Sequence, residues 1–126
     1  MNEAAAISLN EEFEKLTFLP DRRPDTNAAG WFAELAAYRD GAIFIVHYAG
    51  NGEWERHPNA DEIVLIIEGE TTLVLLMNGR EIRNPLRQGQ LIVVPQNTWH
   101  RFESPTAVKV LTVTPQPTDH SADRPQ

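Results

Sequence analysis

The sequence of 126 residues contains no cysteine, so disulfide bonds and thiolate metal ligands are excluded. Lysine is almost absent as well, with two in the chain, and the net charge is −7. A nucleic-acid-binding domain typically clusters lysine and arginine on one face, whereas the arginines here are scattered along the chain. We therefore expect no nucleic-acid partner, and we expect anionic macromolecules to be repelled.

Long apolar runs are also missing, since the longest contain five residues, as in Ile63–Ile67 and Leu73–Met77. A helix that crosses a bilayer needs about 20 apolar residues. Residues 1–20 lack the basic start and apolar stretch that are typical of a secretory signal. The sequence therefore predicts a cytoplasmic protein without a membrane span.

Short apolar runs separated by turn residues fill the chain from Gly41 onward. This spacing, with almost no helical periodicity, is typical of an all-β sandwich or barrel. Asn78-Gly79 is the strongest hairpin signal, because both central residues of a type I′ turn need positive φ. The expected strands are Ala42–Ala49, Ile63–Ile67, Thr71–Met77, Gln90–Val94 and Ala107–Thr114.

The two ends of the chain are less regular than its centre. Residues 1–40 combine one short helical turn with a loop, and Phe32–Tyr38 is predicted to form a hairpin with the strand that follows. Residues 115–126 are rich in Pro, Gln, Thr, Asp and Ser and predict a flexible tail. We expect one domain, in which an N-terminal extension (1–40) packs on a barrel (41–114). His120 lies in the tail, and we expect no role for it.

Acidic and imidazole side chains gather around one turn of the predicted barrel. Glu55 and His57 are two residues apart, so in a strand they share a face, and Pro58–Asp61 is rich in turn formers. After this reversal, Glu62 begins the returning strand and can face the same side. Further along the chain, His100 follows a strand and a Pro/Asn turn. Closure of the sheet would bring His100 to this group.

This pattern resembles the two motifs of the cupin superfamily. The first motif, His-x-His, three or four residues, Glu, six residues and Gly, is matched from Glu55 to Gly69, with Glu55 in the place of the first His. The second motif, Gly, five residues, Pro-x-Gly, two residues, His, three residues and Asn, is matched from Gly89 to Ser104. In it, Asn97 replaces Gly and Ser104 replaces Asn, and Asn tolerates the left-handed conformation almost as Gly does. Nineteen residues separate the two motifs.

The resemblance covers about residues 42–114 and implies a small antiparallel jelly roll, the double-stranded β-helix of the cupins. It also implies that His57, Glu62 and His100 bind a divalent metal ion. Glu55 stands at the fourth ligand position, where it can complete the metal shell, lie behind it, or act as a catalytic base. Two imidazoles with carboxylates favour Fe²⁺, Mn²⁺ or Zn²⁺, and Ni²⁺ is also used in this family.

Three other residues are candidates for the wall of the pocket. Phe102 is two residues after His100 and should share its face. His47 and Tyr48 are neighbours on the preceding strand, so one of them should face the barrel interior.

Two functions remain open at this point. One is a metal-dependent enzyme, of the oxygenase or isomerase type, that acts on a small organic molecule. The other is a non-catalytic cupin that binds a small-molecule ligand and has lost its metal, since fold does not imply function. In either case the apolar strands, together with the resemblance, predict a homodimer.

Overall fold

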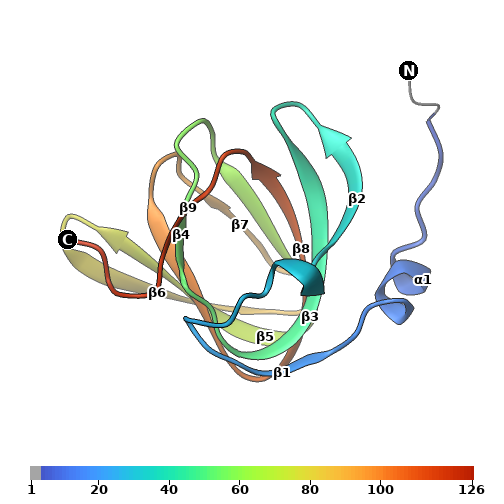
Figure 1. Cartoon of the computed structure of the whole chain (residues 1–126), viewed down its shortest axis with the longest axis horizontal. Helices are drawn as coiled ribbons and strands as arrows, with labels where there is room; N and C mark the ends of the chain where they lie inside the picture. Colours follow the sequence, from blue (N-terminus) through green and yellow to red (C-terminus); the bar gives the residue numbers. More distant parts are fainter. Residues whose placement is uncertain (1–3) are drawn as a thin grey trace.

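The structure is a computed structural model and describes residues 4–126. Strands make up most of it, and they curl into one barrel (Figure 1), which confirms the predicted all-β antiparallel fold. The elements in chain order are α1 (Leu9–Glu14), β1 (Leu19–Arg22), η1 (Ala29–Trp31), β2 (Ala33–Tyr38), β3 (Gly41–Asn51), β4 (Trp54–Arg56), β5 (Glu62–Met77), β6 (Arg80–Arg87), β7 (Leu91–Val94), β8 (Trp99–Pro115) and β9 (Asp119–Ser121). Nowhere in 4–126 is there a helix with the length and apolar character that a bilayer crossing requires.

The two longest strands, β5 and β8, form the frame of the barrel. They pair antiparallel along most of their length. β7 pairs with the first half of β5 and β6 with its second half, while β3 pairs with β8. Because β5 and β8 have different partner strands along their length, they bend from one side of the barrel to the other.

A bulge inside β5 replaces the turn that was expected between Ile63–Ile67 and Thr71–Met77. Gly69 adopts a φ of 84°, and a Cβ there would lie 2.4 Å from the Ala107 carbonyl oxygen. Only glycine combines this conformation with such a close approach, so the strand kinks without ending. The buried residues are Glu62, Val64 and Ile66 before the bulge, whereas after it the odd-numbered Thr71, Leu73 and Leu75 are buried, together with Val74 on the opposite face. The bulge therefore sets which side chains of β5 face inward.

The predicted hairpins are present. Asn78 and Gly79 have φ values of 54° and 73°, and they join β5 to β6. β2 pairs antiparallel with β3, which confirms the hairpin predicted for Phe32–Tyr38. The helix α1 lies outside the barrel next to β3 (Figure 1).

Both ends of the chain add strands to this sheet. From residues 1–40 come β1, which runs parallel to β3, and β2. Residues 115–126 contain β9, which pairs antiparallel with β4. The flexibility expected of this tail stays a prediction, but its strand lies beside the short strand that carries Glu55.

Inward-facing apolar side chains fill the rest of the barrel, up to Val94 and Leu75, the strand partners of Glu62 and His100. They alternate along the strands with exposed positions, as expected for a sheet with one buried face. The buried core consists of Leu19, Ala28, Val46, Tyr48, Val64, Ile66, Leu73, Leu75, Leu86, Val94, Val108 and Val110.

We predict that Gly69→Ala lowers the free energy of unfolding by about 2–4 kcal/mol, because it adds a backbone clash to the strain of positive φ. Gly79→Ala is the matched control, since Gly79 also has positive φ (73°), but a Cβ added there would meet no other atom within 4 Å. The free energy of unfolding of Gly79→Ala should fall by only about 1 kcal/mol. Urea unfolding of both variants measures the difference, and equal losses would contradict the role assigned to the bulge.

Candidate metal centre

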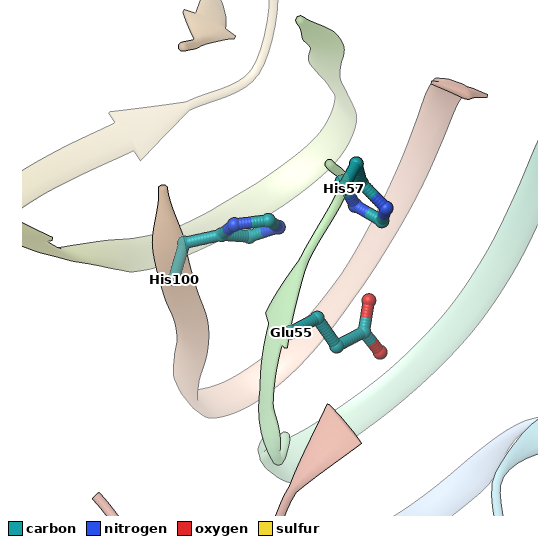
Figure 2. Close-up of side chains that lie close together, drawn as sticks. All are labelled: Glu55, His57 and His100. Atoms are coloured by element: carbon teal, nitrogen blue, oxygen red, sulfur yellow. The ribbon is translucent and has the colours of Figure 1, made fainter. Parts of the chain in front are cut away.

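Glu55 and His57, predicted to share a face, lie opposite His100. In the pairing of β4 with β8, Glu55 is the direct partner of His100, so their side chains leave the sheet on the same side. His57 follows β4 immediately. One potential ligand atom from each of the three residues lies within 4.8 Å of the other two, and Figure 2 shows the side chains pointing into the same space.

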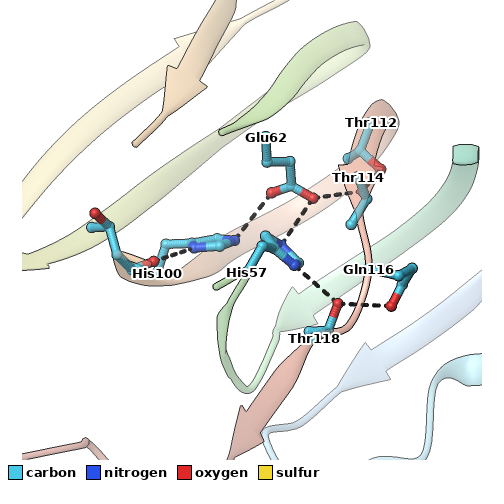
Figure 3. Close-up of polar contacts among 8 residues, drawn as sticks. His57, Glu62, His100, Thr112, Thr114, Gln116 and Thr118 are labelled. Carbon is cyan, nitrogen blue, oxygen red and sulfur yellow. Dashed lines mark hydrogen bonds and ion pairs between the residues drawn. The ribbon is translucent and has the colours of Figure 1, made fainter. Parts of the chain in front are cut away.

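Glu62, the first residue of β5, lies between the two imidazole rings (Figure 3). Its Oε2 is 3.2 Å from Nε2 of His57, and its Oε1 is 3.1 Å from Nε2 of His100. The three residues are at most 4% exposed. The structure therefore brings together all four residues that the sequence suggested as metal ligands.

Two turns hold these side chains in place. The backbone N–H of Asn97 donates to the His57 carbonyl oxygen at 2.9 Å, and the N–H of Gln96 donates to Oδ1 of Asp61 at 2.7 Å. Asn97 has a φ of 60°, the left-handed conformation that the motif otherwise assigns to Gly. The turn after His57 and the turn before His100 therefore form one hydrogen-bonded unit.

Hydrogen bonds on the far side of each ring fix the position of its proton. Nδ1 of His100 is 2.9 Å from the carbonyl oxygen of Thr98, which can only accept, so this Nδ1 carries a proton. The Thr118 hydroxyl donates to Oε1 of Gln116 at 3.3 Å, and so accepts from Nδ1 of His57 at 2.9 Å. In neutral rings with these tautomers, both Nε2 atoms are left with a lone pair that faces inward.

Three acceptor atoms therefore face one another in a buried space. Nε2 of His57, Nε2 of His100 and Oε1 of Glu62 have no aligned hydrogen-bond partner, and the Thr114 hydroxyl donates to Oε2 of Glu62 at 2.6 Å. Burial raises the pKa of Glu62, but when the Nε2 atoms of His100 and His57 carry protons, their hydrogen bonds and charge lower this pKa to about 2. The carboxylate is ionised, and a divalent cation would satisfy all three acceptors.

The pKa shifts of the neighbouring groups also indicate excess negative charge. Burial lowers the pKa of His100, but the contact with the Glu62 carboxylate more than offsets this effect and the pKa is raised. Burial, and then the charge of Glu62, raise the pKa of Glu55. Protons and metal ions are alternative ways to neutralise such a group.

The candidate metal centre lies at the wall of a cavity of about 770 Å³. Glu55, Glu62 and His100 line it, but much of its wall comes from the two ends of the chain, namely residues 22–32 and 116–122. A volume of this size is typical of a small-molecule site.

Of the three residues predicted for the pocket wall, Phe102 lines the cavity. Tyr48 is buried in the core, where the Ser104 hydroxyl donates to its oxygen at 3.4 Å. His47 faces the other side of β3 and packs on Phe18, with ring centroids 4.7 Å apart. Neither Tyr48 nor His47 belongs to the cavity wall.

Sequence reasoning missed His120, for which no role was expected. Nδ1 of His120 lies 2.6 Å from Oε1 of Glu53, and with Glu55 these residues form a second group whose ligand atoms lie within 4.8 Å of one another. His120 also lines the cavity. Its position depends on the pairing of β9 with β4, for which the polar tail carries no sequence signal.

The family described as "Cupin domain" matches residues 42–114, which is more than half of the chain. This chain belongs to the cupin family. The match includes both motifs and all four residues of the candidate metal centre, and the fold is that of the family. The cavity walls contributed by 22–32 and 116–122 lie outside the matched region.

The relatives of this cupin are distant. "Uncharacterized protein YdbB" of Bacillus subtilis (strain 168) is 25% identical over 71 residues, which are 56% of this chain and 59% of that protein. The match therefore spans about three-fifths of the length of that relative.

Solved structures resemble this cupin over more of its length. A cupin-2 domain containing protein from Shewanella frigidimarina has a TM-score of 0.66 and 19% identity, covering 87% of this chain and 94% of that one. A hydroquinone 1,2-dioxygenase from Sphingomonas sp. TTNP3, with 4-hydroxybenzoate bound, has a TM-score of 0.57 and 18% identity. This match covers 64% of the present chain and 62% of the dioxygenase chain. At these identities the likeness is one of fold.

We predict that Asp61→Ala lowers the free energy of unfolding by about 1 kcal/mol, because the Gln96 N–H loses a charged acceptor. Asp40→Ala removes an exposed carboxylate from the turn between β2 and β3 and serves as the control. It should change stability by less than about 0.5 kcal/mol. Thermal unfolding followed by circular dichroism measures both, and an Asp61 variant as stable as the control would show that the two turns hold together without this bond.

Proposed function

We propose that this cupin binds a divalent metal ion through Glu55, His57, Glu62 and His100, and that it acts as a metal-dependent enzyme on a small organic substrate. The observation that carries the proposal is the pair of buried Nε2 atoms that face the Glu62 carboxylate at 3.1–3.2 Å without an aligned hydrogen bond. Buried polar atoms are almost always satisfied, so this arrangement supports a cation that joins them.

The donor set supports a first-row transition metal. Two imidazole nitrogens and two carboxylates form a borderline to hard site, which favours Fe²⁺, Mn²⁺ or Zn²⁺, with Ni²⁺ as a further candidate. The two carboxylate charges match the charge of a divalent ion. When bound, such an ion supplies Lewis acidity toward an oxygen of the substrate or toward O₂.

Hydrogen bonds behind the ligands support their orientation. Thr98 and Thr118 engage the Nδ1 atoms of the two rings, and Thr114 engages Glu62. Partners of this kind fix the tautomer and raise the basicity of the ligand, and losing one typically costs about 10- to 100-fold in metal affinity.

Glu55 is the residue that we propose to take part in proton transfer. It is the more exposed of the two carboxylates and lines the cavity, so a substrate can reach it. An oxygenase is the reaction class to assay first, because one of the solved relatives is a hydroquinone 1,2-dioxygenase. Isomerase activity is the second class.

We predict that the purified protein, loaded with Fe²⁺, Mn²⁺ or Zn²⁺ and dialysed, retains close to one ion per chain, and that His57→Ala and His100→Ala each lose it. His47→Ala should retain the ion, because His47 packs outside the barrel. Elemental analysis by mass spectrometry gives the ion content, and a higher melting temperature on metal addition gives a second readout. Less than about one-tenth of an ion per chain in the wild type would favour a cupin that binds a ligand without metal.

We also propose that two copies of the chain associate through the outer face of β5 and β7. Ile63, Leu91 and Val93 are 39%, 59% and 49% exposed on this face, and Ile63 and Val93 are direct partners. Within residues 4–126, β7 pairs only with β5, so its other edge is unpaired. An apolar edge strand of this kind is normally covered, and a second copy of the same strand fits it.

Leu91→Glu is predicted to convert a dimer to a monomer, because it places a charge in the apolar contact. Tyr38→Glu, at another exposed apolar position, on β2 (49% exposed, against 59% for Leu91), should leave the dimer intact. Light scattering coupled to size-exclusion chromatography gives the mass of each species. A monomeric wild type, or a dimer broken by the Tyr38 variant and not by the Leu91 variant, would show that this face is not the interface.

A further inference from the structure

The wall of the cavity contains one buried cation, Arg22, at the end of β1. The residue is 5% exposed. Its backbone is fixed by the parallel pairing with Gly50, whose Cβ, if present, would lie 2.2 Å from the Arg22 carbonyl oxygen. A Cβ on Gly52 would lie 3.2 Å from the guanidinium carbon. The two glycines of the Gly50-Asn-Gly52 turn therefore make room for this arginine.

Aromatic rings pack against the guanidinium, and the Glu55 carboxylate is close enough to interact with its charge. The guanidinium lies over the ring of Tyr48 at 4.8 Å and over that of Phe32 at 5.6 Å. Among the ion pairs formed within residues 4–126, none involves Arg22. Its Nε is buried without a hydrogen-bond partner.

A buried charge without an ion-pair partner is costly, and arginine cannot avoid the cost by losing its proton. The guanidinium faces a cavity of about 770 Å³, from which a partner can reach it. We infer that Arg22 binds the carboxylate group of the molecule that occupies this cavity. A carboxylate matches the planar, two-pronged geometry of a guanidinium.

The rest of the wall limits what this molecule can be. Phe32, Phe44 and Phe102 give it aromatic surface, which suits a planar apolar body. The carboxylates of Asp25, Glu53, Glu55 and Glu62 also line the cavity and repel an anion, so the acid group of the ligand has to lie at Arg22, the one arginine in this lining. The ligand class is therefore a small aromatic carboxylic acid bound with its acid group on Arg22. This inference rests on the proposed function, since it names the ligand class of the same cavity.

The test compares aromatic acids with their uncharged amides. Benzoate, phenylacetate and 3-phenylpropionate are each paired with the primary amide of the same shape, and binding is measured by calorimetry and ligand-observed NMR. At least one acid should bind wild-type protein about tenfold or more tightly than its amide, because a charge-assisted hydrogen-bond pair is lost in the amide. Arg22→Met should abolish this preference, and Arg22→Lys should reduce it without abolishing it.

Arg23→Met is the matched control. Arg23 is the next residue, but its side chain is 70% exposed and pairs with Asp21 at 3.0 Å, so this variant should keep the wild-type preference. Circular dichroism establishes that each variant is folded, and if Arg22→Met is not, Arg22→Lys carries the comparison. Failure of all three acids to bind, equal affinity for acids and amides, or an Arg22→Lys variant with the full preference would overturn the inference.

All measurements are made on metal-loaded and on chelator-treated protein. The acid-over-amide preference should persist without metal, because Arg22 is not part of the metal centre. A protein that prefers acids but binds no metal would refute the proposed metal-dependent function and leave the carboxylate site intact. A protein that binds metal but shows no acid preference would refute the carboxylate site and leave the proposed metal binding intact.

Discussion

The Glu62 carboxylate between two imidazole rings is the contact on which the site depends. Each of its oxygens lies 3.1–3.2 Å from an Nε2 atom, in surroundings that are almost fully buried. The Nδ1 protons of both rings are engaged by oxygens on the other side, so in the neutral rings the inward-facing nitrogens are acceptors. Placing acceptors together away from water is unfavourable unless positive charge joins them. This contact is therefore the main support for the proposed metal ion.

The strand pattern explains how a chain of this length creates that space. A directly opposed pair on β4 and β8 places Glu55 beside His100. The bulge at Gly69 lets β5 present Glu62 inward in its first half and core side chains inward in its second half. The same strand therefore supplies Glu62 to the polar site and apolar side chains to the core, although its pairing with β8 shifts register at the bulge.

Local patterns in the sequence were sufficient to predict most of this arrangement. The alternation of apolar residues gave the barrel, Asn78-Gly79 gave its clearest hairpin, and the spacing around Glu55 and His100 predicted that the four polar residues meet. What local patterns could not give were contacts between distant segments of irregular sequence. Arg22 lies in a stretch that looked like a loop, and His120 in one that looked like a tail. A glycine in a turn motif does not reveal that its missing Cβ accommodates an arginine 30 residues away.

The cavity wall is formed partly by the centre of the chain and partly by its two ends. Substitutions in these two parts are expected to have different effects. The four candidate metal ligands lie in the region that matches the cupin family, 42–114, whereas much of the cavity wall comes from 22–32 and 116–122. Substitutions in the end segments can alter which molecule is accepted while the reactive centre stays as it is. In such a barrel, ligand specificity can change through the two end segments while the four candidate metal ligands stay the same.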